Sequence, residues 1–302
     1  MKFNPSMLRK WQECQLQAYL STQIEMPWEQ NAAASAGTCV HEAIELLNTT
    51  NDYTQAVERF KYTWANPEVL DATPVSWPAR TNYDTYLKMG LKAVESYYEK
   101  SRLEERVVIA TEHRFQIPYG DHTLSGIVDE LTMTYDKDGK PVLEIIDLKT
   151  NSRKPTKNEL RMNIQMTSYV YASYQPEFWL GWEPEIEKYK PMKDGQDWLE
   201  IFQTPGIERK AYWWHLRTGQ KLYAGDRTEA DFLRLYRLLM SIDDATKAGV
   251  FVPTIDYDNC FFCPFKEQCT AVGPVEYELL ENQRRVEQTL DQHRKTYDNK
   301  WE

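Results

Sequence analysis

The chain changes from a helical to a strand-like pattern at Arg106. Three strand-like segments follow, over residues 106–118, 122–135 and 142–150, and the DKDGK before the third carries an Asp-Gly pair typical of a hairpin turn. The third segment, VLEIIDLKT, is apolar enough to be a central strand. Segments of this kind form a sheet that must be covered by other elements.

Helical patterns lie on both sides of these strands. The spacing of apolar residues predicts the helices, and a capping-box-like TEAD and Gly249 bound the last of them. One further strand is expected at residues 211–216. The expected helices cover residues 5–20, 33–47, 83–100, 159–174 and 228–249. This order predicts an α/β fold with a central mixed sheet flanked by helices.

We expect a single domain over residues 1–275, followed by a helical tail over 276–302. Within the domain, residues 48–106 form a mostly helical insertion. Residues 175–210, rich in Pro, Trp and charge, form an arm. A cysteine-containing segment occupies residues 255–272.

The net charge of −10, from 36 basic and 46 acidic residues, argues against a protein that coats nucleic acid indiscriminately. It does not exclude an enzyme that meets the phosphate backbone at one metal site. No apolar stretch approaches the length of a membrane span, and the N-terminus lacks the apolar run of a secretion signal. We therefore expect a soluble, cytoplasmic protein.

Asp147 and Lys149 lie two residues apart in the third strand, so their side chains emerge on the same face. A carboxylate beside a lysine suits metal-dependent phosphodiester cleavage, in which the carboxylate anchors a cation and the amine offsets growing negative charge. Asp129, in GIVD of the preceding strand, can place a second carboxylate beside Asp147, and Gly126 leaves room near the backbone. Taken alone, the D-x-K spacing is better explained by a solvated ion pair at the end of a strand.

Other polar residues could complete such a site. His41 lies one helical turn before Glu45, and it does not form a zinc protease motif, because HExxH would need a histidine at position 45. Gln165 and Tyr169 share a helix face. Glu112 is a possible extra carboxylate or a surface charge. Each of these residues also has an ordinary structural interpretation.

The order of His41, GIVD, EIIDLKT and QMTSY over residues 35–172 resembles the RecB-like branch of the PD-(D/E)XK nucleases. The resemblance implies a restriction-endonuclease-like core and magnesium or manganese as cofactor. It also implies roles for individual residues. The implied metal ligands are His41, Asp129, Asp147 and the carbonyl of Leu148; the implied catalytic residues also include Lys149, which positions the attacking water, with Gln165 and Tyr169 bracing the site.

Three cysteines, Cys260, Cys263 and Cys269, form a compact group near the C-terminus. Their spacing alone is compatible with structural zinc or with an iron–sulfur cluster. The sequence also resembles AddB-type nucleases and CRISPR-associated Cas-four-type exonucleases, in which one cysteine precedes the nuclease motifs and three follow. That resemblance implies a 4Fe–4S cluster with Cys14 as the fourth ligand, which would staple the two ends of the domain. Cys39 is left over as a packed residue.

Four basic residues, Arg153, Lys154, Lys157 and Arg161, follow Lys149 closely. They are candidates for contact with DNA phosphates, and a solvated loop is the alternative. The resemblance implies a metal-dependent DNA exonuclease acting in repair, recombination, replication or CRISPR-type processing. Alternatives are the nuclease subunit of a helicase–nuclease or CRISPR adaptation complex, and a catalytically silent DNA-binding scaffold. Because no phosphate-binding loop of a motor occurs, any helicase would be a partner.

Overall fold

The computed structural model describes residues 1–24, 31–66, 77–180, 202, 206–255, 260, 263–266 and 268–269. The chain divides into two compact units, one of Met1–Pro5 and Trp28–Arg237 and the other of Ser6–Pro27 and Leu238–Glu302. The expected single domain over 1–275 stays a prediction. The expected tail over 276–302 and residues 181–201 and 203–205 of the arm expected over 175–210 lie outside the described residues. None of the described helices has the apolar length that a membrane span requires.

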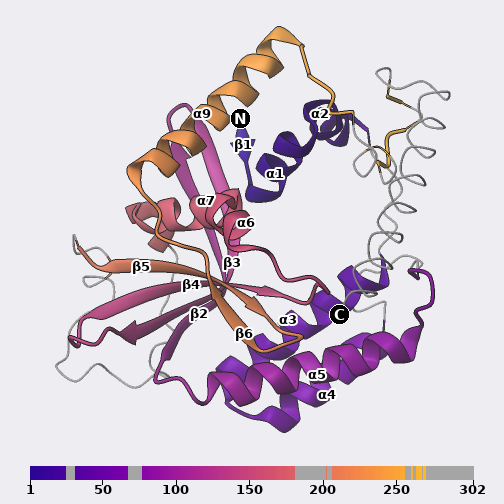
Figure 1. Cartoon of the computed structure of the whole chain (residues 1–302), viewed down its shortest axis with the longest axis vertical. Helices are drawn as coiled ribbons and strands as arrows, with labels where there is room; N and C mark the ends of the chain where they lie inside the picture. Colours follow the sequence, from indigo (N-terminus) through magenta and orange to yellow (C-terminus); the bar gives the residue numbers. More distant parts are fainter. Residues whose placement is uncertain are drawn as a thin grey trace, which may run out of the picture. The chain divides into compact units, whose positions relative to one another are not determined.

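A mixed sheet forms the centre of the first unit (Figure 1). Its described strands are β1 (Lys2–Phe3), β2 (Val107–Tyr119), β3 (His122–Tyr135), β4 (Pro141–Lys149), β5 (Glu208–His215) and β6 (Gln220–Tyr223). The order is β1-β3-β4-β5-β6, with β2 paired to β3. The β2–β3, β3–β4 and β5–β6 pairs are antiparallel, and β4–β5 is parallel. The predicted α/β class with a mixed sheet is confirmed.

Helices cover both faces of this sheet (Figure 1). The helices of one face are α3 (Ala32–Thr50), α4 (Tyr53–Ala65) and α5 (Tyr83–Ser101), and the short helices of the other are α6 (Lys157–Met162) and α7 (Ile164–Ser173). Side-chain caps fix where they begin: Asn31 accepts from Ala34 N at 2.8 Å, and Asn82 accepts from Thr85 N at 2.9 Å. These caps satisfy backbone donors that a helix N-terminus leaves unpaired.

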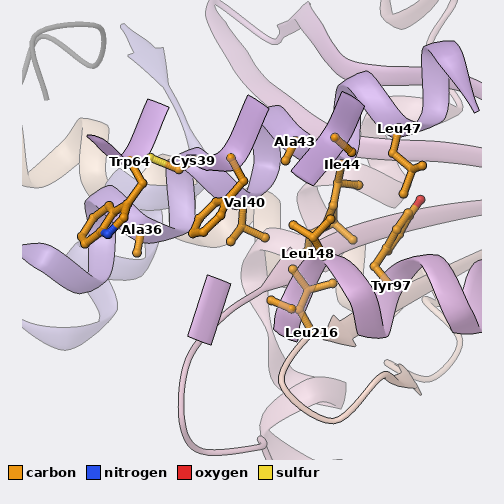
Figure 2. Close-up of a cluster of buried hydrophobic side chains, with 14 of the residues drawn as sticks. Ala36, Cys39, Val40, Ala43, Ile44, Leu47, Trp64, Tyr97, Leu148 and Leu216 are labelled. Atoms are coloured by element: carbon orange, nitrogen blue, oxygen red, sulfur yellow. The ribbon is translucent and has the colours of Figure 1, made fainter. Parts of the chain in front are cut away.

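The core between the sheet and α3 combines small and branched side chains with aromatic rings (Figure 2). Val40, Ile44 and Leu47 of α3 pack against Leu148 of β4 and Leu216 after β5, and all are buried. This apolar stripe holds α3 close to the end of β4, because burying it removes apolar area from water. The helix that carries His41 is thereby placed beside the strand that carries Asp147.

The described fold differs from the expected elements at several points. The helix expected over 159–174 breaks at Asn163, whose extended backbone ends α6 and whose side chain caps α7 by accepting from Met166 N at 3.0 Å. The helix expected over 5–20 breaks at Cys14, the extended N-cap residue of the second helix. The hairpin partner β6 was not expected, although Gly219 marks its turn with a φ of 64°.

The second unit contains most of α1 (Pro5–Glu13), all of α2 (Gln15–Gln23) and the end of α9 (Glu229–Ala248). Phe251 stacks on Tyr19 with ring centroids 3.8 Å apart and meets Trp11 edge-on at 6.0 Å. The backbone N–H of Val252 donates to Gln15 Oε1 at 2.9 Å. These contacts join the segment after α9 to α1 and α2. Cys14 lies between these two helices.

Candidate metal centre

Strands β3 and β4 separate next to Asp129. The last pair of their ladder is Glu130–Ile146. Beyond it, the backbone N–H of Leu148 in β4 donates to Asp129 Oδ2 at 2.6 Å. A side-chain carboxylate thus replaces a backbone carbonyl as the acceptor. This hydrogen bond fixes the Asp129 carboxylate at the end of β4, because its donor, Leu148, directly follows Asp147 in the chain.

His41 reaches the same place from α3. Its Nε2 donates to the carbonyl oxygen of Leu148 at 3.0 Å, which leaves Nδ1 facing two carboxylates. Nδ1 lies 3.8 Å from Glu112 Oε1 and 3.8 Å from Asp129 Oδ1. A metal-bound histidine usually donates its other N–H to a carbonyl or carboxylate, and Leu148 provides that acceptor. The carbonyl of Leu148 was expected to bind the metal itself, and this role stays a prediction.

Glu112 is the third member of this group. The β2–β3 pairs Thr111–Glu130 and His113–Val128 place it opposite Asp129, and its φ of 47° is left-handed. A non-glycine residue in this region costs about 1–2 kcal/mol, so surrounding structure must hold it there. Potential ligand atoms of His41, Glu112 and Asp129 all lie within 4.8 Å of one another. The structure therefore brings Glu112 into the site and not onto a strand surface.

Asp147 is turned toward Lys149. Lys149 Nζ lies 2.7 Å from Asp147 Oδ2, and only 1% of the Asp147 side chain is exposed. Beyond this ion pair, neither carboxylate oxygen of Asp147 accepts a hydrogen bond within the described part of the chain. A buried carboxylate with unused lone pairs is costly in free energy. A divalent cation would remove that cost, so the residues fit a metal site.

The pKa shifts at the site reflect burial and the neighbouring carboxylates. Burial raises the pKa of Asp129 to about 6, with the neighbouring charge of Asp147 adding to the effect. Burial by itself would lower the pKa of His41, but the carboxylates of Asp129 and Glu112 outweigh it and raise the pKa. Burial, followed by the charges of Asp147 and Asp129, raises the pKa of Tyr169 well above its usual range. Oxygen donors with one imidazole and surplus negative charge suit Mg²⁺ or Mn²⁺.

Gln165 and Tyr169 close one side of the site from α7. Gln165 Nε2 donates to Tyr169 Oη at 2.8 Å, and the ring of Tyr169 is buried against Phe115. A Cβ on Gly126 would lie 2.7 Å from the Phe115 ring and 3.2 Å from the Tyr169 ring. Gly126 is therefore required for these rings to approach β3, in agreement with the room that the sequence predicted.

The basic residues after Lys149 fall into two kinds. Arg153 makes two hydrogen bonds to Glu159, of 3.1 and 2.6 Å, and Arg161 makes two to Asp231, of 2.6 and 2.8 Å. Lys154 instead donates to a neutral side chain, Gln220 Oε1, at 2.8 Å. Lys157 is exposed. The expected contact of all four with DNA stays a prediction, but the two arginines are already paired with carboxylates.

The sequence did not indicate a second set of contacts around the end of β4. Parallel pairing places His215 beside Lys149. From there, His215 Nε2 donates to the carbonyl of Asn151 at 2.8 Å, and its Nδ1 accepts from Thr218 Oγ1 at 2.9 Å. Burial lowers the pKa of His215, which favours the neutral ring that these two bonds require. Only the parallel register, which the sequence does not show, brings these residues together.

In the second unit, four cysteines line one cavity: Cys14, Cys260, Cys263 and Cys269. Cys14 Sγ accepts from Gln17 N at 3.5 Å and from Thr254 N at 3.4 Å, and all four thiols are free of disulfides. Burial, together with the charges of the other three thiols, raises the pKa of Cys263. Cys39 is instead fully buried among the apolar side chains of α3 and α4, and burial raises its pKa to about 11. The structure thus separates the four expected ligands from the fifth cysteine.

Comparison with known proteins gives one family. The model of the PD-(D/E)XK nuclease superfamily matches residues 2–270. No curated protein sequence matches the chain. One solved structure, titled "Crystal structure of SSO0001", is similar over 88% of this chain and 95% of that chain, with 11% sequence identity and a TM-score of 0.29.

Proposed function

Because this chain belongs to the PD-(D/E)XK nuclease superfamily, we propose that it hydrolyses phosphodiester bonds in DNA at the site of His41, Asp129 and Asp147. The observation that carries the proposal is the convergence of His41, Glu112 and Asp129 within 4.8 Å, next to the buried ion pair of Asp147 and Lys149. Magnesium or manganese is the proposed cation, since oxygen ligands dominate the site.

His41, Glu112 and Asp129 would hold the cation, and Asp147 would contribute a further carboxylate oxygen beside them. A bound divalent cation supplies Lewis-acid polarisation of the phosphate and lowers the pKa of a bound water. Lys149 would orient the attacking water and offset the negative charge of the transition state. Asp147 keeps the ammonium of Lys149 in place through their contact of 2.7 Å. Gln165 and Tyr169 would exclude water from one side and touch the DNA.

Exonuclease action is the finer proposal, and it rests on the resemblance to AddB-type and Cas-four-type nucleases. The test is digestion of end-labelled linear DNA, single- and double-stranded, and of covalently closed circular DNA, with Mg²⁺ or Mn²⁺. An exonuclease degrades the linear forms and leaves the circle intact. Cutting of the circle would show an endonuclease instead.

The catalytic assignment needs its own comparison. We expect Lys149→Ala and Asp147→Ala each to lower cleavage by roughly 10²-fold or more, because each removes charge that acts on the transition state. Lys137→Ala, at the β3–β4 turn, is the matched control and should cut normally. Undiminished cutting by both site variants would show that the site is wrongly placed.

A 4Fe–4S cluster bound by Cys14, Cys260, Cys263 and Cys269 is the second part of the proposal. The four cysteines line one cavity, which supports a bound metal group there, and structural zinc is the alternative to the cluster. Iron and sulfide analysis of anaerobically prepared protein tests this, and zinc without iron would exclude the cluster.

The wider process follows from the same resemblance. We propose a role in repair, recombination, replication or CRISPR-type DNA processing, either alone or as the nuclease partner of a helicase or an adaptation complex. The alternative of a catalytically silent DNA-binding scaffold makes a different prediction. It requires DNA binding without any metal-dependent cleavage, so the digestion described above separates the two.

A further inference from the structure

The turn between β5 and β6 is held tightly on α5. Gly219, in this turn, has a φ of 64°, and a Cβ there would lie 2.6 Å from Ser96 Oγ and 2.9 Å from Lys100 Cγ. Both the backbone conformation and the close approach to α5 therefore favour glycine. The turn is fixed in position independently of any substrate.

The same turn holds the backbone that follows Lys149. Three successive carbonyls each accept one hydrogen bond from it: Lys149 O from Leu216 N at 2.9 Å, Thr150 O from Arg217 Nε at 2.5 Å, and Asn151 O from His215 Nε2 at 2.8 Å. The Thr150 side chain packs on Gly37, one helical turn before His41. The turn therefore lies directly beside the proposed cleavage centre.

These contacts set the direction of the Arg217 side chain. Because Nε is used by Thr150, the guanidinium is anchored with its two terminal nitrogens remaining as donors. Arg217 forms no ion pair with a carboxylate in the described ranges, and neither does Lys154, which is exposed and joined to Gln220 at the start of β6. The guanidinium and the ammonium thus come from two adjoining segments, the β5–β6 hairpin and the loop after β4.

This combination matches the chemistry of phosphate binding. An anchored guanidinium presents paired donors to two phosphate oxygens, and a nearby ammonium adds a point charge. The arginines of the same region are unsuitable, because Arg153 and Arg161 each already form two hydrogen bonds with a carboxylate. The structure therefore selects Arg217, which lies outside the basic run of the sequence.

We infer that Arg217 and Lys154 bind a backbone phosphate of the DNA substrate, adjacent to the phosphate that is cleaved. The inference rests on the proposed nuclease function and adds a binding contact to it. Such a contact positions the strand over the metal centre without reading its sequence. It gives a chain of net charge −10 a local attraction for the backbone.

The test measures equilibrium binding of a fluorescent single-stranded DNA to the full chain. Fluorescence anisotropy reports the binding over a salt series with Mg²⁺ present. The Lys149→Ala background prevents cleavage during the measurement. We expect Arg217→Gln and Lys154→Gln each to weaken binding roughly five- to tenfold and to reduce the salt slope by about 0.7 per lost contact. Arg217→Lys, which keeps the charge and loses the fork, should lose less.

The control is Lys137→Gln, which removes one positive charge from an exposed lysine of the β3–β4 turn, at the opposite end of β4 from Lys149. It should leave the DNA affinity and the salt slope unchanged. Mg²⁺ affinity and thermal stability of each variant show that the fold and the metal site persist. An Arg217→Gln variant that matches its parent in affinity and slope, while the unmodified chain cuts DNA, would overturn this inference alone. An equal loss in Lys137→Gln would overturn it as well. If the unmodified chain neither binds nor cuts DNA, the proposed function fails with it.

Discussion

The Oδ2 atom of Asp129 accepts a hydrogen bond from the backbone N–H of Leu148 at 2.6 Å. This contact does two things at once. It gives the backbone of β4 an acceptor beyond the last β3–β4 ladder pair. It also holds a carboxylate in a mostly buried position near Asp147. The chain thus stabilises its sheet with the same group that raises the electrostatic cost of the site.

Replacement of Asp129 by Asn should separate these two effects. The amide oxygen can still accept from Leu148, while the buried charge disappears. We expect cleavage to fall by roughly 10²-fold or more, because a metal ligand is lost. We expect the metal-free protein to gain about 1–2 kcal/mol in free energy of unfolding at pH 7.5, less than the full cost implied by a pKa of about 6. Urea unfolding in EDTA measures the gain.

The pH dependence of that gain gives the control. Asp129 has a folded-state pKa of about 6 against an ordinary value of 3.8, so the native state binds its proton more tightly. Its contribution to stability is present below about pH 4 and is lost as the pH rises toward 6. The stabilisation by Asp129→Asn should therefore shrink at pH 4. Asp136→Asn, at a turn carboxylate whose pKa is lowered by backbone N–H donors, should destabilise at pH 7.5 instead.

Metal binding should follow the same titration. The cation and the proton compete for Asp129, and His41, whose pKa is also raised, must lose its proton before Nδ1 can bind. We expect the rise in melting temperature on adding Mn²⁺ to be large at pH 7.5 and to decline as the pH falls through 6. Calorimetry in buffers of different ionisation enthalpy should show proton release on binding near pH 6. A metal effect that is equal at pH 5 and pH 7.5 would contradict the assignment of these ligands.

Local patterns predicted the sheet and the shared face of Asp147 and Lys149, whereas the resemblance to RecB-like nucleases implied the roles of the residues in the metal centre. The D-x-K spacing needs only the alternation of a strand, and the placement of Asp129 needs only the hairpin that the Asp-Gly turn indicates. The room beside Gly126 and the shared helix face of Gln165 and Tyr169 follow from similar local rules, while the roles of these two residues in the site follow from the resemblance. These features depend on neighbours in the chain, so a single sequence carries them.

Other features depend on register between distant segments. Glu112 joins the site because β2 pairs with β3 in a register that places it opposite Asp129, with a left-handed backbone that no motif indicates. Arg217 reaches Thr150 only because β4 and β5 pair in parallel. The basic run was assigned by charge alone, and one of its carboxylate partners, Asp231, comes from a helix 70 residues away from Arg161. Sequence spacing contains no information on such pairings.

Cys14 should act on the folding of the second unit. It caps α2 and lines the cavity shared with the other three cysteines. We expect Cys14→Ala to lose iron and to lower thermal stability, whereas residual folded protein should still bind Mn²⁺ and cut DNA. Cys39→Ala, in the apolar core, should keep its iron content. Iron and sulfide analysis with thermal unfolding makes the comparison. A Cys14→Ala protein of normal stability that fails to cut would show that the cluster serves catalysis.

Glu130, which follows Asp129 and points to the opposite face of β3, should contribute strongly to the stability of the first unit. Glu130 is fully buried and pairs through Oε1 with Arg106, while Asn48 Nδ2, at 2.8 Å, and Tyr97 Oη both donate to its Oε2. Removing one member of a buried pair leaves the other charge without a partner and costs about 3–5 kcal/mol. We expect Glu130→Gln to reach this range in urea unfolding, and Glu130→Gln with Arg106→Met to recover part of it. Glu159→Gln, which breaks the exposed pair with Arg153, should change stability little. Similar losses for Glu130→Gln and Glu159→Gln would show that the buried pair contributes no more to stability than an exposed one.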